Sequence, residues 1–181
     1  MASYFIYLIS SLPALSFGAK PPLSFEKFLA TCKTLVSDEE FSALSGLKNA
    51  EVVPSHKIKN PTLRKWRAFD AMVRNELVEI RASRKKVNPA KYLRPDGRPE
   101  SSHAAHIAIN AYRKPSLFEA EKELDLERWR KLDEFSVGHY FDMDALVIYG
   151  VKLLILEKWD RINTADGKRL LEEVLAGSAE K

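Results

Sequence analysis

Residues 60–86 read NPTLRKWRAFDAMVRNELVEIRASRKK, and their periodicity indicates the class of fold. Apolar side chains recur three and four residues apart along this stretch, which places them on one face of an α-helix. They are Leu63, Trp66, Phe69, Val73, Leu77 and Ile80. Asn60 and Pro61 are typical of a helix start, with Asn as the N-cap and Pro in the first helical position. The stretch therefore predicts a long amphipathic helix that ends by Asn88-Pro89.

The same helical signals recur on both sides of this stretch. Ser24, Ser37 and Asp142 each precede an apolar run at helical spacing, so we expect each of them to cap a helix. The run over 146–156 is apolar on nearly all sides, which is typical of a helix at the centre of a core. Further helices are expected from Ser101 or Ser102 to Arg113, from Pro115 onward with a fresh turn capped by Asp125, and from Asn163-Thr164 to Gly177.

These signals predict an all-α protein, a multi-helix bundle of antiparallel helices. Three prolines and an Asp96-Gly97 pair interrupt the helical pattern between Val87 and Ser102, as expected of a loop. We therefore expect an N-terminal helical half over 1–86, a Pro-rich loop over 87–102 and a C-terminal helical half over 103–181. A chain of 181 residues is long enough to bury a core, and the two halves are expected to form one compact domain.

Charge is distributed unevenly along the chain. The net charge is +4, but residues 56–98 hold thirteen Lys or Arg against four Asp or Glu. The remainder of the chain is therefore net acidic. This asymmetry suggests a basic face that meets an acidic partner, although a solvated face gives the same pattern. The candidate contact residues share one helix: Arg67, Arg74 and Arg81, which recur every seven residues, and Arg84.

Residues 3–12 resemble the apolar part of a secretory signal, but no Lys or Arg comes before Lys20. Because a secretory signal normally has a basic start, we expect instead a buried first element that Pro13 ends or kinks, with a secreted or periplasmic helical protein as the alternative. No segment reaches the roughly 20 apolar residues needed to span a bilayer. The lone Cys32 cannot form an internal disulfide, which fits a reducing compartment, and is expected to be a small buried hydrophobe.

Patterns that carry catalytic chemistry are missing from the sequence. There is no phosphate-binding or dinucleotide glycine pattern, no Gly-x-Ser-x-Gly and no Cys-x-x-Cys. His103 and His106 have a spacing that could hold a metal, but no further ligand converges on them. His139 with Asp142 and Asp144 could suggest acid–base work, but a helix cap and first-turn acids explain both aspartates. We expect no catalytic residue, cofactor, metal or small-molecule substrate, with an enzyme site built from distant residues as the alternative.

The basic stretch also suggests a small nucleic-acid-binding module or a general protein-interaction module. Clustered Lys and Arg are what phosphate binding needs. However, Asp70, Glu76 and Glu79 interrupt the positive charge, and Trp66 and Phe69 belong to the apolar stripe rather than to an exposed stacking surface. Nucleic acid is therefore the weaker alternative.

Three stretches carry a family resemblance. They are residues 4–15, residues 63–81 with Leu63-x-x-Trp66-x-x-Phe69, and residues 121–156 with Glu121-x-x-Leu124-Asp125-x-x-x-Trp129. Together they resemble an uncharacterised bacterial family encoded among the components of V-type (archaeal-type) rotary ATPases. The third stretch is also similar to the helical repeat of the C/d component of those ATPases, in which a Leu-Asp pair opens a helix and a long apolar helix follows.

This resemblance implies a non-catalytic subunit that couples the soluble motor and central stalk of a V-type ATPase to the membrane rotor ring during ion transport, proton transport included. The implied partners are the central stalk and membrane ring subunits. The implied location is cytoplasmic, with membrane association only indirectly, through the complex. In this role the four arginines would contact an acidic surface of the stalk or ring. The C/d component has three similar helical units, and this chain is roughly half the length of that component.

Overall fold

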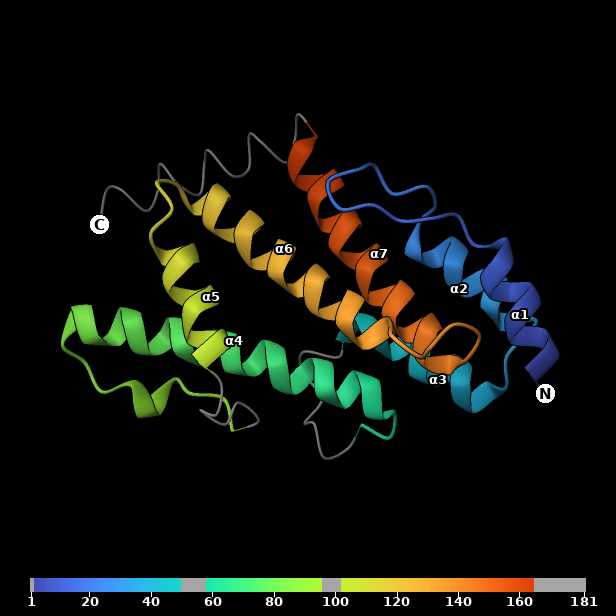
Figure 1. Ribbon diagram of the computed structural model, residues 1–181, viewed down its shortest axis with the longest axis horizontal. Helices are drawn as coiled ribbons and strands as arrows, with labels where there is room; N and C mark the ends of the chain where they lie inside the picture. Colours follow the sequence, from blue (N-terminus) through green and yellow to red (C-terminus); the bar gives the residue numbers. More distant parts are fainter. Residues whose placement is uncertain (1, 50–57, 96–101, 165–181) are drawn as a thin grey trace. The chain divides into compact units, whose positions relative to one another are not determined.

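The computed structural model describes residues 2–49, 58–95 and 102–164 (Figure 1). These residues form seven α-helices, two short 3-10 helices and no strand, which confirms the all-α prediction. The elements are α1 (Ala2–Ser11), α2 (Phe25–Lys33), α3 (Asp38–Ser45), η1 (Gly46–Asn49), α4 (Pro61–Lys85), η3 (Pro89–Lys91), α5 (Ser102–Tyr112), α6 (Leu117–Ser136) and α7 (Met143–Asn163).

The chain divides into two compact units, and the first is built from both ends of the sequence. The first unit comprises Met1–Ser45 and Phe141–Lys181, and the second comprises Gly46–Tyr140. The expected halves, 1–86 and 103–181, do not coincide with these units. The reason is that α7 packs with α1, α2 and α3, whereas α4 packs with α5 and α6. Apolar faces pair by fit, and the order of helices along the chain does not determine which faces meet.

The first unit is organised around α7. As the sequence predicts, this helix buries side chains on most of its circumference, among them Leu146, Leu153 and Leu156, which are fully buried. The helices around it contribute Leu8, Phe25, Phe28, Cys32 and Leu44, all with no exposed surface. The predicted cap is confirmed, because Oδ1 of Asp142 accepts a hydrogen bond from the Ala145 amide at 2.9 Å.

Local capping also defines the starts of α2 and α3. The hydroxyl of Ser24 accepts from the Lys27 amide at 3.2 Å, as predicted. Ser37 and Glu40 form a capping box: the Ser37 amide donates to the Glu40 carboxylate at 2.9 Å, and the Glu40 amide donates to the Ser37 hydroxyl at 3.4 Å. The carboxylate of Glu157, on α7, accepts from the Phe25 amide at 2.7 Å and so links α7 to the positive end of the α2 dipole.

Cys32 is a buried hydrophobe, as expected. Its side chain has no exposed surface, and burial raises the pKa of its thiol to about 12. The Tyr149 ring packs against Phe28 with 5.4 Å between centroids, and its hydroxyl donates to the Pro13 carbonyl at 2.9 Å. Burial, together with the nearby Cys32, raises the pKa of Tyr149 to about 12. Both groups are therefore neutral at physiological pH.

The first element is a helix that ends before Pro13, as predicted, but it is only partly buried. Leu8 is fully enclosed, whereas Ile6 is 48% exposed and Tyr7 is 71% exposed. A single amphipathic helix at the margin of a unit buries one stripe only, which explains the difference from the expected buried element. Among the helices of the described residues, none combines the length and the apolar character that crossing a bilayer requires.

The second unit is built on α4, whose start and apolar stripe follow the prediction. Oδ1 of Asn60 accepts from the Leu63 amide at 2.7 Å, and Pro61 is the first helical residue. The stripe is buried from Leu63 to Leu77, and Ile80 near its end is partly exposed. The ammonium group of Lys131, on α6, lies 5.7 Å from the centroid of the Phe69 ring.

The predicted break at Asp125 is wrong, because α6 continues without interruption from Leu117 to Ser136. Its cap is Ser116, whose hydroxyl accepts from the Glu119 amide at 3.1 Å. Asp125 is only 2% exposed and bonds to Arg128 one turn later in the same helix. An Asp caps a helix only when its carboxylate accepts a hydrogen bond from a nearby backbone amide. Here the carboxylate of Asp125 accepts instead from the buried guanidinium of Arg128. The helix expected after Asn163 lies outside the described residues.

Candidate functional site

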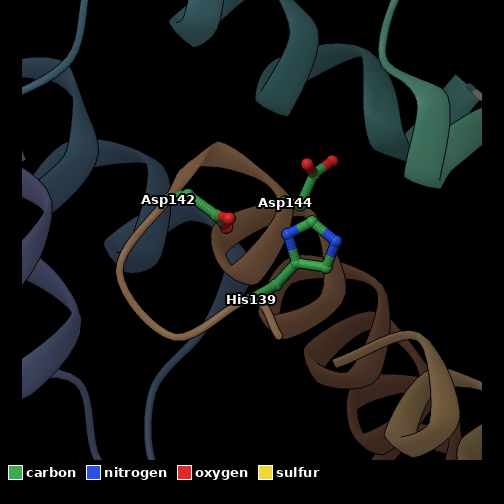
Figure 2. A group of neighbouring side chains, drawn as sticks. All are labelled: His139, Asp142 and Asp144. Atoms are coloured by element: carbon green, nitrogen blue, oxygen red, sulfur yellow. The ribbon is translucent and has the colours of Figure 1, made fainter. Parts of the chain in front are cut away.

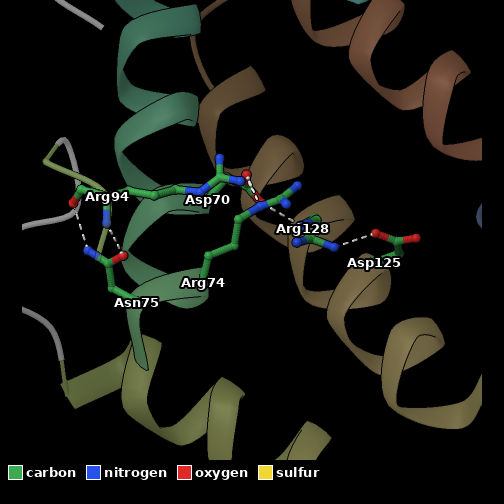
Figure 3. Close-up of polar contacts among 6 residues, drawn as sticks. All are labelled: Asp70, Arg74, Asn75, Arg94, Asp125 and Arg128. Carbon is green, nitrogen blue, oxygen red and sulfur yellow. Dashed lines mark hydrogen bonds and ion pairs between the residues drawn. The ribbon is translucent and has the colours of Figure 1, made fainter. Parts of the chain in front are cut away.

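A row of four charged side chains joins α4 to α6 in the second unit (Figure 3). Nε of Arg74 lies 2.7 Å from Oδ2 of Asp70, and Nε of Arg128 lies 2.8 Å from Oδ1 of the same Asp70. Nη1 of Arg128 then lies 2.7 Å from Oδ1 of Asp125. The charges alternate along the row, so two arginines and two aspartates compensate one another.

At the centre of the row, Asp70 and Arg128 each favour the charged form of the other. Burial by itself would raise the pKa of Asp70, but Arg128 and Arg74 offset this and hold the pKa of its carboxyl below the ordinary value. Burial would likewise lower the pKa of Arg128, but the carboxylates of Asp70 and Asp125 more than offset it and raise that pKa. With both Asp70 oxygens engaged by guanidinium groups, the row acts as a fixed tie between the two helices.

The structure does not bring the four predicted contact arginines together on one surface. Arg67 is 7% exposed, and the side chain of Arg74 is 30% exposed and bound to Asp70. Arg81 and Arg84 are exposed. Residues seven apart point within about 20° of one another on a helix, so Arg67, Arg74 and Arg81 share a face. Along that face Arg67 is buried, Arg74 is partly exposed, and Arg81, in the last turns of α4, is exposed.

An exposed basic surface remains at the C-terminal end of α4. We call it the basic end and define it as Arg81, Arg84, Lys85, Lys86 and Lys91, all of which are exposed. The guanidinium of Arg84 lies over the ring of Tyr112, 5.2 Å from its centroid, and donates to the Tyr112 hydroxyl. This contact joins the end of α5 to the end of α4. The sequence indicated the basic residues of the helix itself, but not which of them would be accessible.

The loop that follows α4 turns back along the helix. Lys86 ends α4 in the left-handed conformation, with φ of 53°, and Val87 donates its amide to the Ala82 carbonyl at 3.1 Å. Asn88 then starts the 3-10 turn η3 by accepting from the Ala90 amide at 2.9 Å. We call residues 86–95 the return loop.

A buried asparagine holds the far end of the return loop against α4 (Figure 3). Asn75 is 8% exposed; its Oδ1 accepts from the Arg94 amide at 2.8 Å, and its Nδ2 donates to the Arg94 carbonyl at 2.9 Å. Sequence reasoning missed this role. The available signal was an Asn in the middle of a long helix, where its side chain is unfavourable unless it has a specific partner.

The segment between α6 and α7 brings three possible metal ligands near one another (Figure 2). One ligand atom each from His139, Asp142 and Asp144 lies within 4.8 Å of the others. Asp142 is the N-cap of α7, and Asp144 lies in its first turn, where the helix dipole favours a negative charge. The start of the helix therefore accounts for both carboxylates, as the sequence predicted.

Two other pairs of residues that the sequence singles out are not members of the basic end. His103 and His106 are both exposed on α5. Trp66 is 8% exposed and Phe69 is 4% exposed, so neither offers a stacking surface to a nucleic acid.

The model of a family described as "Protein of unknown function (DUF2764)" matches residues 105–178, which include most of α5 and all of α6 and α7. No curated protein and no solved structure matches the chain.

Proposed function

We propose that the protein is a non-catalytic helical subunit of a V-type rotary ATPase that links the soluble motor and central stalk to the membrane rotor ring. The proposal starts from the resemblance of residues 63–81 and 121–156 to proteins encoded with that complex. In the structure these stretches are α4, α6 and α7, the three longest helices of the described residues. The proposed location is the cytoplasmic side of the membrane, where the complex would hold the protein.

The observation that carries the proposal is the basic end. Five cationic side chains lie within eleven residues, and all are exposed. Within the part of the chain that the structure describes, no carboxylate forms an ion pair with Arg81, Lys85 or Lys86. Like charges gathered in this way repel one another, and an acidic surface on a partner relieves the repulsion while it steers association. An acidic face of the stalk or ring is the proposed partner.

The charged row supports a coupling role, because a protein that links two parts of a motor has to keep its shape under load. Arg128 reaches from α6 to Asp70 on α4, and Arg84 on α4 reaches Tyr112 on α5. The basic end is thus tied to all three α-helices of its unit. Directional polar contacts of this kind resist sliding of one helix along another more than apolar packing does.

The test is recovery of the ATPase with the tagged protein from membranes solubilised in mild detergent. We expect the catalytic, stalk and ring subunits to follow the wild type, and the Arg81→Glu, Arg84→Glu double variant to recover at least about tenfold less, since each reversed charge removes an attraction and adds a repulsion. The matched control reverses two exposed lysines of the first unit, Lys27→Glu and Lys33→Glu. Equal recovery with both double variants would contradict the assignment of the surface, and recovery of no ATPase subunit with the wild type would remove the proposed function.

A further inference from the structure

We propose that the return loop binds the headgroup layer of an anionic membrane directly, with its lysines at lipid phosphates and its apolar side chains at the edge of the hydrocarbon. This goes beyond the proposed function, which assigns only protein partners to the protein. It does not rest on that function, because its partner is a lipid surface, which the return loop and the adjacent cations of α4 would contact.

The charge of the segment suits an anionic surface. Residues 81–94 contain six Lys or Arg and no Asp or Glu. The loop returns from Lys86 to Asn75, which is about 16 Å back along α4 at 1.5 Å per residue. The cations of helix and loop are therefore spread over a patch rather than gathered at a point. A lipid surface offers negative charge over the whole of such a patch, and each Lys or Arg near it contributes about fivefold in affinity.

Apolar side chains lie exposed among these cations. Val87 is 47% exposed, Tyr92 is 58% exposed and Leu93 is 36% exposed. Three large apolar side chains in seven residues of one loop are unfavourable in water. Basic residues interleaved with an aromatic ring and aliphatic side chains form the composition that settles at a membrane interface.

This mixture favours a lipid surface over a nucleic acid. Tyr92 could stack on a base, but Val87 and Leu93 gain nothing from phosphates or from base edges. A bilayer interface accommodates all three side chains, and it needs no pocket shaped to match them. The lysine stems add apolar surface at the same depth while their ammonium groups remain at the phosphates.

The loop is held in shape even though these side chains are not packed. Lys86 fixes its start in the left-handed conformation, Asn88 closes the turn at η3, and Asn75 bonds both backbone groups of Arg94. A loop ordered in advance loses less conformational entropy when it binds. Its exposed side chains are therefore presented to a surface rather than collapsed onto the unit.

The first experiment is co-sedimentation of the purified full-length protein with vesicles. One set contains equal parts of phosphatidylcholine and phosphatidylglycerol, and the other contains phosphatidylcholine alone. We expect binding to the anionic vesicles that weakens as salt is added, because screening shortens the reach of the cations. The Lys85→Glu, Lys86→Glu, Lys91→Glu triple variant should bind at least about 100-fold more weakly.

A matched charge control separates the loop from the net charge of the protein. Lys20, Lys27 and Lys33 are exposed and belong to the first unit. Their triple change to Glu alters the net charge by the same amount, and we expect less than about threefold weaker binding. Equal losses from the two triple variants would overturn the proposal, because the attraction would then belong to overall charge. Far-UV circular dichroism of each variant checks that the helices are intact.

A second pair of variants tests the apolar side chains. Tyr92→Ser with Leu93→Ser should weaken binding to anionic vesicles about tenfold, because the inserted apolar area is lost. Val137→Ser with Tyr140→Ser removes two side chains elsewhere that are more exposed than Tyr92 and Leu93, at 75% and 67%, and should leave binding unchanged. Absence of wild-type binding to anionic vesicles would overturn the proposal, as would binding to single-stranded RNA without binding to vesicles. Vesicles contain no ATPase and the detergent pull-down contains no bilayer, so the two proposals fail separately.

Discussion

In the unit formed by α1, α2, α3 and α7 the buried side chains are apolar, whereas the unit formed by α4, α5 and α6 buries charge. All six polar or charged side chains that are buried among the described residues lie in the second unit: Thr62, Arg67, Asp70, Asn75, Asp125 and Arg128. The first unit places its polar groups at helix starts instead, as with Ser24 and Asp142.

The contrast shows two ways of holding helices together. Apolar burial is strong but non-directional, so a helix in such a core can adjust its position by small shifts. A buried row of ion pairs adds little net stability compared with apolar packing, but it fixes one arrangement, since any other leaves a charge unpaired. The second unit, which carries the basic end, is the one whose interior contains such directional ion pairs.

The largest expected effect comes from breaking the charged row. Arg128→Leu leaves the carboxylates of Asp70 and Asp125 buried without their shared partner, and we expect the second unit to lose about 3–5 kcal/mol of stability. Hydrogen exchange followed by mass spectrometry should show faster exchange in α4 and α6 and little change in α7. Arg130→Leu is the control, because that side chain is 60% exposed and its loss should cost less than about 1 kcal/mol. Similar exchange in both variants would show that the row is not what holds the helices.

Truncating the apolar core of the first unit gives the complementary result. Leu153 has no exposed surface, and Leu153→Ala should cost about 2–5 kcal/mol through lost burial and the cavity that remains. Here the faster exchange should appear in α7 and α2, and α6 should change little. The neighbouring Leu154 is partly exposed, so Leu154→Ala should cost less. If α6 opened as much as α7, the two units would not be separable in stability.

Acid should distinguish the two interiors. The folded pKa of Asp70 is below its unfolded value of about 3.9, so its contribution to stability is fully present above that pH. It is lost as the pH falls through the folded pKa, because the protonated carboxyl no longer pairs with Arg128 and Arg74. Single-tryptophan variants that retain either Trp129 or Trp159 report on the second and first units by fluorescence. As the pH is lowered, we expect the fluorescence of Trp129 to change before that of Trp159. The opposite order would contradict the assignment of the acid-sensitive ion pairs to the second unit.

A smaller effect is expected where Asn75 bonds to Arg94 and holds the return loop against α4. Asn75→Ala removes the partner of the Arg94 amide and carbonyl, and we expect a loss of about 1–2 kcal/mol that is confined to the loop, because water can replace part of the bonding. Trypsin should then cleave faster after Lys86 and Lys91. Asn110→Ala, at an exposed position of α5, should leave these cleavage rates unchanged. If the loop resisted trypsin equally well without Asn75, the hydrogen bonds between Asn75 and Arg94 would not be what orders it.

Helix caps should show the smallest effect, and one that does not differ between the units. Asp142→Ala in the first unit and Ser116→Ala in the second each leave one first-turn amide without its side-chain acceptor. We expect each change to lower the free energy of unfolding by about 1 kcal/mol, measured by urea denaturation. A large difference between the two would mean that one cap also has a tertiary role.

Much of the local structure was predictable. The starts of α2, α4 and α7 at Ser24, Asn60 and Asp142 follow from side-chain bonds that reach three residues along the chain. Asp125 shows the limit of such reasoning. Its sequence context resembles a helix start, but its partner is a guanidinium on the buried side of the same helix, and whether that side is buried depends on α4.

The basic surface was predictable in composition but not in extent. Arg67 and Arg81 occupy the same face of one helix two heptads apart, and nothing local distinguishes them. One is buried and the other exposed, a difference that only the tertiary structure decides. The return loop joins the surface through a bond between Asn75 and Arg94, nineteen residues apart.

The sequence by itself determined that the chain is helical, where most of the described helices begin, and that positive charge is concentrated around α4. These depend on periodicity and on interactions within one turn, which the order of residues specifies directly. Only the tertiary structure decided that α7 joins the N-terminal helices, that the buried charges pair in one row, and which lysines and arginines face solvent. Those outcomes depend on which apolar faces meet, and that is settled by the fit of whole helices against one another.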